Sequence, residues 1–477
     1  MPTVVFANAP RNWLREILVA PDELYCTCAK PTTNRSESRM PLGDYDAAKI
    51  IATLPPPWNN PTLMVVYYDP SGISTPRNLQ AVPCPKVLIT GDTHHGKDWL
   101  LNTFLHYSLE PYDLVAASYD RQHLHFFAEL EKGVVGWLPQ QTVDPLETVP
   151  PRAWTQRRHD MSFVGQVRQL HPFREHVIRA LKQVKVPIQI VSAPREVAGK
   201  IHADSRISLN ASLNGDMNLR VLEILASGSL LITDKLSPES GMSLLFEEGR
   251  HYLTYENDAD LHRKIPYYAE HPREAESIAN AGQAAYLRGH RAQHKVQLLS
   301  HLLKQCEWPY DVSDDGRMHL PEQDMENLLD RIRVYQWLQE KHRTEMRVHA
   351  LFWPGTERYA SDAIDLPRLR ATLLREKFSQ AEDKDSLGQV LAHRVTWRDA
   401  ASAHEPPKAE RIWDAVVCPA EAISDSSFQP LLQKSFAQSF LLTGYRPGMF
   451  KMPLPDFQKR YAVVAASHEP LCLIPKN

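Results

Sequence analysis

Short runs of β-branched and other apolar residues alternate with amphipathic stretches along most of this chain. In the first 120 residues the apolar runs are 3–9, 63–69, 86–92 and 112–118. Stretches with helical periodicity, such as "GKDWLLNTFLHYSL", lie between them. Parallel sheets covered by helices produce this alternation, because each strand must be followed by a crossover helix before the next strand. The sequence therefore predicts an α/β fold.

Two proline-bearing segments divide the pattern. The first is 137–160, where four prolines and many polar residues predict a linker without regular elements. The second is 307–323. We therefore predict domains at 1–150, 151–306 and 321–477.

The second domain is predicted as another α/β series and the third as a smaller α/β module. The expected elements of the second domain are strands at 161–166, 186–192, 206–212 and 229–234, with helices at about 172–183 and 272–305. Those of the third are a helix at about 324–344 and strands at 346–353, 393–399, 414–420 and 439–445.

Composition excludes several classes of protein. The 477 residues are 43% hydrophobic, which is enough for two or three cores, and the net charge of −3 gives no global basic field for nucleic acid. We find no signal peptide and no apolar run long enough to span a membrane, so a cytoplasmic location is expected. Cys26 and Cys28 lack a second ligand pair at metal-binding spacing, and no metal is assigned.

The stretch "SLNGDMNLRVLEILASGSLLITD" (212–234) has a polar front and an apolar body. If a helix covers 216–227, then Asp216, Arg220, Glu223 and Ser227 form one narrow polar stripe on an otherwise buried helix. Gly228 is expected to end it. An alternative is that Arg220 and Glu223 simply pair with each other, one turn apart.

The polar front of this stretch suits a phosphate group. Asn214, Asp216 and Asn218 are all capable N-caps, and a helix N-terminus offers free backbone N–H groups to an anion. Arg220 would add a forked donor, and Glu223 is an acceptor for vicinal hydroxyl groups such as those of a ribose.

A second phosphate-binding candidate is "FVGQVRQLHPFR" (163–174), where a strand runs into Gly165. Arg168 and Arg174 lie near the start of the next helix, in a region (151–200) with ten basic and three acidic residues. This local excess suits a diphosphate, although a solvated helix face also accounts for part of it.

In the first domain, "LITGDTHHGKDW" (88–99) places Asp92, His94 and His95 just beyond a strand. Either histidine or the aspartate could act as a general base toward an acceptor hydroxyl, while an exposed loop histidine without a role is the alternative.

These motifs together resemble a known family. The segments "HDMSFVGQ", "RISLNASLNGDMNLRVLEILASGSLLITD" and "EEGRHYLTYENDADL" look like the nucleotide-binding half of a GT-B glycosyltransferase, in the group-one-like, spore-maturation (CgeB-type) branch. The segments "ITGDTHHG", "YDLVAAS" and "WLPQQTVDP" look like its acceptor half.

The resemblance implies two Rossmann-like domains facing a cleft, with the third module appended. It implies metal-independent transfer of a sugar from a nucleotide-diphosphate donor, expected to be a UDP-sugar, without another cofactor. Asp92, His94 and His95 are the expected catalytic residues. The expected donor-binding residues are Gly165, Arg168, Asn210, Asn214, Asp216, Asn218, Arg220, Glu223 and Ser227. Members of the family often have two glutamates eight residues apart, and the first of these positions is Gly215 here, which leaves the stereochemical outcome open.

Several functional alternatives stay open at the level of sequence. A catalytically weak scaffold or coat-type protein, and a nucleotide-sugar epimerase, are compatible with the same fold. The acceptor could be a protein, a glycan or a hydroxylated base in DNA. The third module faintly resembles the strand order of a nucleotide-dependent methyltransferase but lacks its G-x-G turn, so we expect a degenerate module for self-association or partner binding.

Overall fold

The chain forms two compact units, Met1–His319 and Leu320–Asn477, and each is described by itself. The computed structural model describes residues 3–8, 24–28, 37–40, 43–68, 74–91, 93, 98–118, 121–130, 133–139, 152–167, 171–291, 294, 301, 322–363, 366–367, 369–375, 395–399, 413–424, 439–443, 461–464 and 471–475. Within this described part, no helix is both long and apolar enough to cross a membrane.

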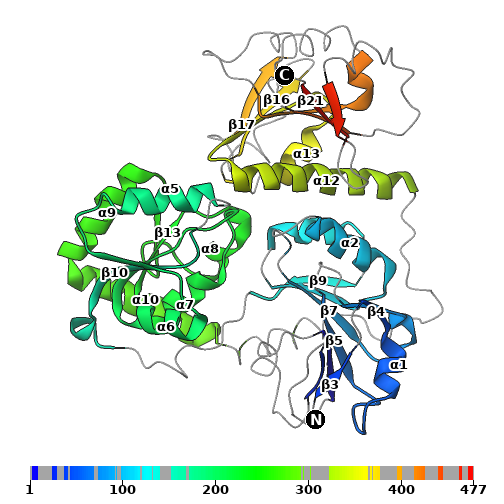
Figure 1. Ribbon diagram of the computed structural model, residues 1–477, viewed down its shortest axis with the longest axis horizontal. Helices are drawn as coiled ribbons and strands as arrows, with labels where there is room; N and C mark the ends of the chain where they lie inside the picture. Colours follow the sequence, from blue (N-terminus) through cyan, green and yellow to red (C-terminus); the bar gives the residue numbers. More distant parts are fainter. Residues whose placement is uncertain are drawn as a thin grey trace. The chain divides into compact units, whose positions relative to one another are not determined.

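The first unit contains two large parallel sheets, drawn in Figure 1, and a small two-stranded parallel pair. The first sheet has the strand order β3-β2-β1-β5-β7-β8-β9, and all its pairs are parallel. Its strands are β1 (Val4–Ala7), β2 (Leu24–Cys28), β3 (Glu37–Arg39), β5 (Leu63–Tyr68), β7 (Lys86–Thr90), β8 (Leu114–Ala117) and β9 (Val134–Trp137). The helices and the small β4-β6 pair of this region are α1 (Ala47–Ala52), α2 (Trp99–Leu109), α3 (Leu124–Ala128), β4 (Gly43–Asp46) and β6 (Ser74–Arg77).

The second sheet has the order β11-β10-β12-β13-β14, again with all pairs parallel. Its strands are β10 (His159–Val164), β11 (Ile188–Val191), β12 (Ser205–Leu209), β13 (Leu230–Asp234) and β14 (Leu253–Tyr255). Its helices are α5 (Pro172–Leu181), α6 (Arg195–Ala203), α7 (Leu219–Ser227), α8 (Met242–Leu245), α9 (Asp258–Glu270) and α10 (Pro272–Gly289). Helices α5 and α9 cover one face, and α6, α7 and α10 cover the other (Figure 1).

The strand order of the second sheet reverses beside β10. From β10 the chain moves outward to β11, and then crosses back to form β12 on the opposite side of β10. Crossover helices leave a crevice at such a switch point, outside the carboxyl ends of the strands, and open α/β sheets bind their ligands there. The carboxyl ends of β10 and β12 are therefore the first place to look for a site.

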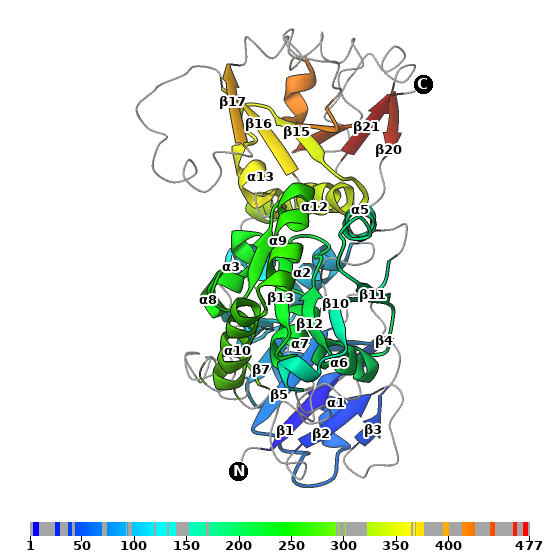
Figure 2. The same cartoon turned by 90° about the vertical axis from the view of Figure 1, so that its left-hand side faces the viewer.

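The second unit is a seven-stranded sheet with the order β17-β16-β15-β18-β19-β21-β20, in which β21 is antiparallel to its neighbours. Figure 2 shows its strands side by side. The strands are β15 (Val348–Phe352), β16 (Leu369–Arg375), β17 (Val395–Asp399), β18 (Ala415–Pro419), β19 (Phe440–Thr443), β20 (Tyr461–Val464) and β21 (Leu471–Pro475). Helices α12 (Glu322–Thr344) and α13 (Glu357–Asp362) pack against it.

The predicted α/β fold class is confirmed, and most predicted strands occur within two residues of their expected positions. The expected linker at 137–160 is wrong at both ends. Trp137 still belongs to β9, and β10 already begins at His159, whose backbone N–H donates to the Asp204 carbonyl. The long closing helix is also shorter than expected, because α10 ends at Gly289 with His290 as its C-cap.

The helix expected at 216–227 begins three residues later than predicted. Asn218 is the N-cap of α7, and its side-chain oxygen accepts a hydrogen bond from the Arg220 backbone N–H at 3.1 Å. Gly228 ends the helix in the left-handed conformation (φ 69°), as predicted. Asp216 therefore lies in the preceding loop, and the four-residue stripe does not exist on one helix.

The apolar body of α7 is packed as expected. Val221, Leu222 and Ile224 have no exposed surface, and they contact residues of β13, α8 and α10. Burial of each such side chain stabilises the fold by about 1.5–3 kcal/mol. Helix α7 is therefore held rigidly against its sheet, which fixes the position of its N-terminus.

The second unit depends on one buried ion pair. Arg331 of α12 donates to both carboxylate oxygens of Asp362 of α13, at 2.7 and 2.6 Å, and both side chains are almost fully buried. Removing one partner leaves the other charge in the core without this ion pair, which costs far more than losing an exposed pair.

We predict that Arg331→Ala lowers the stability of the second unit by about 3–5 kcal/mol. The matched control is Arg250→Ala, which removes an exposed pair with Glu247 and should cost at most about 1 kcal/mol. Hydrogen exchange measured by mass spectrometry tests both variants. Helices α12 and α13 should lose protection in Arg331→Ala and keep it in Arg250→Ala. Wild-type protection of α12 in that variant would contradict the prediction.

Candidate functional site

Two arginines meet at the switch point of the second sheet. Arg220, in the first turn of α7, donates from Nε to the Val164 carbonyl at the end of β10 (2.6 Å) and from Nη1 to Asn210 Oδ1 just beyond β12 (2.8 Å). Arg174 of α5 donates to the carbonyls of Gln166 and Ala211, both at 3.1 Å. Each guanidinium therefore joins the chain beyond β10 to the chain beyond β12.

Neither of these arginines has an ion-pair partner among the described residues. Burial, together with the charge of Arg174, lowers the pKa of Arg220 to about 10, although Glu223, Asp216 and Asp234 act in the opposite direction. Burial also lowers the pKa of Arg174. Both groups remain cations at neutral pH, so two positive charges share a desolvated place without direct neutralisation.

Part of the hydrogen-bonding capacity at this place is unused. Arg174 is 7% exposed, and its Nε has no hydrogen-bond partner in the described structure. The Asn218 side-chain nitrogen at the start of α7 is buried and also lacks one. Of the Arg220 nitrogens, Nη2 makes no described hydrogen bond. Donors that converge on one place and have no acceptor are suited to an anion.

Gly165 provides the space that Arg220 occupies. A Cβ at this position would lie 2.3 Å from Arg220 Nη2 and 3.1 Å from its Cζ. The Gly165 backbone N–H donates to the Val191 carbonyl, so the glycine cannot easily move aside. The glycine predicted from the strand-to-turn motif is therefore needed for the arginine, whatever it contributes to a ligand.

The loop between β12 and α7 is held by a continuous polar network. Asn210 accepts from Arg220 and donates from Nδ2 to Thr233 Oγ1 (2.9 Å). The Asp234 carboxylate accepts from the Ser212 backbone (2.8 Å) and hydroxyl (2.5 Å), and Ser212 Oγ accepts from the Gly215 backbone N–H (3.1 Å). The last residues of β13 therefore determine the course of the loop that precedes α7.

Asp216 helps to shape this loop. Its Oδ1 accepts hydrogen bonds from the backbone N–H groups of Leu213 (3.3 Å) and Asn214 (3.1 Å), and Gly215, between Asn214 and Asp216, adopts φ 75°. Asp216 is 3% exposed, so the structure gives it a role in holding the turn. Asn214 is fully buried in the same turn.

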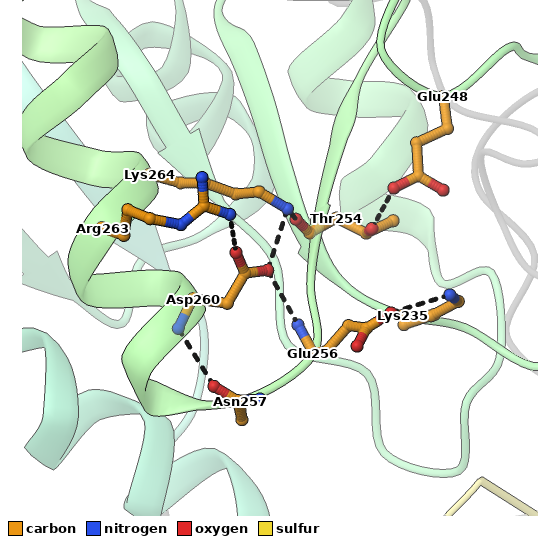
Figure 3. A network of polar contacts seen from close by, with 8 residues as sticks. All are labelled: Lys235, Glu248, Thr254, Glu256, Asn257, Asp260, Arg263 and Lys264. Atoms are coloured by element: carbon orange, nitrogen blue, oxygen red, sulfur yellow. Dashed lines mark hydrogen bonds and ion pairs between the residues drawn. The ribbon is translucent and has the colours of Figure 1, made fainter. Parts of the chain in front are cut away.

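A second polar network supports the loop from the side of β14 and is drawn in Figure 3. Asp260 accepts from Lys264 (2.8 Å), from Arg263 (2.6 Å) and from the Glu256 backbone N–H (3.3 Å), which fixes the start of α9. Tyr255, next to Glu256, donates its hydroxyl to the Asn210 carbonyl (3.2 Å). Helix α9 and β14 thus hold Asn210 in place.

The predicted site residues fall into three groups. The structure brings Gly165, Asn210, Asn218 and Arg220 together, with Asn214 and Asp216 in the adjoining loop and Glu223 one turn beyond Arg220. Ser227 is set apart, at the other end of α7, where its hydroxyl donates to the Ile224 carbonyl (2.7 Å). Asp92, His94, His95 and Arg168 lie outside the described residues.

Sequence reasoning did not assign several residues of this site. Arg174 was placed only near a helix start, and Ser212, Asp234 and Tyr255 were not considered individually. Asp234 had a usable signal, because a charged residue that directly follows a buried strand lies at the ligand-binding edge of a parallel sheet. The sequence carried no such signal for Arg174, because its two carbonyl partners are 8 and 37 residues away.

His202 lies beneath this site and is fully buried. Its Nδ1 lies 3.1 Å from Ser208 Oγ, which also receives a hydrogen bond from Ser229. Burial lowers the pKa of His202 to about 3, and the charge of Arg220 adds to that effect. The imidazole is therefore neutral in the folded protein at any ordinary pH.

Part of the chain matches a known protein family. Residues 168–301 match the family described as "Glycosyl transferase-like". This segment is under a third of the chain and contains Arg174, Arg220 and Glu223. The glycosyltransferase class expected from the motifs is therefore confirmed for this part of the chain. The match names no branch within that class.

Three solved structures are similar to this chain at low identity. HepE of Anabaena, solved in complex with UDP-glucose, is 13% identical with a TM-score of 0.47, over 64% of this chain and 100% of HepE. Sucrose-phosphate synthase from Thermosynechococcus elongatus is 10% identical with a TM-score of 0.45, over 63% and 98% of the two chains. A glycosyltransferase from Rickettsia africae is 10% identical with a TM-score of 0.45, over 65% and 100%. No curated protein matches the chain in sequence.

We predict that Gly165→Ala weakens anion binding at this site without unfolding it, because the new Cβ displaces the flexible end of Arg220. Pyrophosphate should raise the melting temperature of the wild type, and the variant should need at least about ten times more, a difference of about 1.4 kcal/mol. Gly289→Ala is the matched control, since a Cβ there meets nothing within 4 Å. Equal responses of Gly165→Ala and wild type would rule out this role for the glycine.

We also predict that the buried histidine makes the protein less stable in acid. In the unfolded chain His202 titrates near its ordinary pKa of about 6.5, whereas in the folded protein it stays neutral down to about pH 3. The unfolded state therefore gains protons first, and stability falls as the pH drops below 6.5, by about 2 kcal/mol between pH 7 and pH 5. Urea unfolding at the two pH values measures the loss, which should shrink in His202→Gln. An identical loss in the variant would show that other groups cause it.

Proposed function

We propose that this protein is a GT-B glycosyltransferase of the group-one-like, CgeB-type branch, which transfers a sugar from a nucleoside diphosphate donor to an acceptor hydroxyl. The observation that carries the proposal is the pair of guanidinium groups at the switch point of the second sheet, of which Arg174 is buried and Arg220 is half-buried. They face each other's charge without an ion-pair partner in the described structure. A diphosphate supplies the charge that would neutralise both.

Bound diphosphate would offset the unfavourable free energy of holding two cations close together. Burying an unpaired cation is unfavourable, and two of them repel each other in surroundings that screen charge poorly. The N-terminus of α7 adds backbone N–H groups and the positive end of the helix dipole. Arg168, in the loop after Gly165, is proposed as a further ligand of the diphosphate.

The same groups would assist the chemical step. When the bond between sugar and diphosphate breaks, negative charge develops on the leaving phosphate. Donors that are already oriented toward that charge stabilise the transition state without reorganising. We propose that Arg174, Arg220 and the start of α7 do this, so that the transfer is independent of a metal.

Other residues are proposed to bind the ribose of the nucleotide sugar and to activate the acceptor. Glu223 is one helical turn beyond Arg220 and half-buried, and we propose that its carboxylate accepts hydrogen bonds from both ribose hydroxyls. Asp92, His94 or His95, which follow β7, are proposed to activate the acceptor. We propose a UDP-sugar as donor, no other cofactor and a cytoplasmic location. The acceptor class, whether protein, glycan or a hydroxylated base in DNA, stays open.

We predict that Glu223→Ala weakens UDP binding about tenfold or more and leaves pyrophosphate binding unchanged, because only the nucleotide carries the ribose. Calorimetric titration with each ligand measures both values. Glu270→Ala, which removes an exposed carboxylate on α9, is the control and should bind both ligands like wild type. Equal loss of both ligands in Glu223→Ala would contradict the ribose role. Failure of the wild type to bind UDP, GDP, TDP and ADP, or their sugars, would refute the function itself.

A further inference from the structure

A buried carboxamide in a turn beside the first sheet has no hydrogen-bond partner among the described residues. Gln122 lies in the short 3-10 turn η3 (Arg121–His123), shortly after β8, and is 3% exposed. Neither its Oε1 nor its Nε2 has a partner within the described structure. A primary amide left in this state forfeits several hydrogen bonds that water would otherwise satisfy, which is costly in a folded protein.

The neighbours of Gln122 are otherwise well bonded. His123 Nδ1 lies 2.7 Å from Thr93 Oγ1, and the Ser118 hydroxyl donates to the Thr90 carbonyl (2.8 Å). These contacts hold the turn against the ends of β7 and β8. The unsatisfied amide is therefore fixed in place by partners on both sides, so it is not a product of a loose turn.

A second unpaired donor lies on the adjacent strand. Trp137 ends β9 beside Ala117 of β8, and its indole Nε1 is buried without a hydrogen-bond partner in the described structure. The guanidinium of Arg121 lies over its ring, 5.9 Å from the ring centre. The carboxyl ends of β8 and β9 thus carry an amide with donor and acceptor atoms and an indole N–H donor, all uncommitted.

These groups connect to the loop that shapes the diphosphate site. Arg121 donates from Nη1 to the carbonyl and to Oε2 of Glu239, both at 3.1 Å. Two residues earlier in the chain, Ser237 donates its backbone N–H to the Gly215 carbonyl (3.0 Å). Gly215 itself is three residues before the N-cap of α7. Arg121 therefore links the turn of Gln122, through Glu239 and Ser237, to the loop that precedes α7.

We propose that Gln122 and Trp137 bind hydroxyl groups of the transferred sugar. A carboxamide can donate to one hydroxyl and accept from another, and the indole N–H can donate to a third. In the loop before α7, residue 215 is a glycine and has no side chain to bind the sugar. Asp216 Oδ1 already accepts hydrogen bonds from two backbone N–H groups. The first sheet would then supply the polar contacts to the sugar. This inference rests on the proposed function of the diphosphate site.

The test compares UDP with UDP-sugars on the full-length protein. Calorimetric titration with UDP, UDP-glucose, UDP-galactose and UDP-N-acetylglucosamine gives, for each sugar, the ratio of its affinity to that of UDP. We expect Gln122→Leu to lower the best ratio at least fivefold while the affinity for UDP stays at the wild-type value. Gln283→Leu, which removes a carboxamide of α10 that donates to the Ala226 carbonyl of α7, is the control and should keep the ratio.

Each other result overturns the inference. If Gln122→Leu keeps the wild-type ratio, or if the wild type binds no UDP-sugar better than UDP, the carboxamide does not bind the sugar. If the wild type does not bind UDP at all, the proposed function fails together with the inference. Should Gln122→Leu not fold, the titration of Trp137→Phe decides, since it removes the indole N–H but keeps an aromatic ring and must also lower the ratio.

Discussion

The structure of the second sheet depends on how it holds two positive charges where its strand order reverses. Arg174 and Arg220 are anchored by backbone carbonyls and one amide oxygen, and the described structure pairs neither with a carboxylate. Carbonyl oxygens orient a guanidinium without cancelling its charge. A carboxylate in place of these oxygens would neutralise the arginines within the protein, and the site would then not attract an anion.

The rest of this part of the molecule can be understood as support for that arrangement. The Asp234 carboxylate holds Ser212, and Asn210 is held by Thr233 and Tyr255. Because every member of this network bonds to the next, loss of one partner would leave a buried polar group without a hydrogen bond. This would lower the stability of the fold by about 1–3 kcal/mol. The apolar contacts of α7 make the helix start equally fixed. A site prepared in this way loses little entropy when it binds its ligand.

Local rules were enough to predict the elements and the cap residues, since hydrophobic alternation, Asn218 and Gly228 act over a few neighbouring residues. They were not enough to choose among three possible caps. Asn214, Asp216 and Asn218 all qualify by type, and the choice fell to Asn218 because Asp216 is used by the turn around Gly215. The sequence motif singled out Gly165. It did not reveal why a glycine is needed there, which is that Arg220 occupies the space a Cβ would fill. The positions of Arg174 and of the turn that carries Gln122 are fixed by contacts between distant segments, which no local pattern reveals.

The account is tested most directly by a crystal structure of the protein with bound UDP. It predicts a diphosphate whose oxygens lie within hydrogen-bond distance of the Arg174 and Arg220 guanidinium groups and of the backbone N–H groups at the start of α7, with the ribose at Glu223. UDP bound elsewhere, with both guanidinium groups contacting only protein, would contradict it.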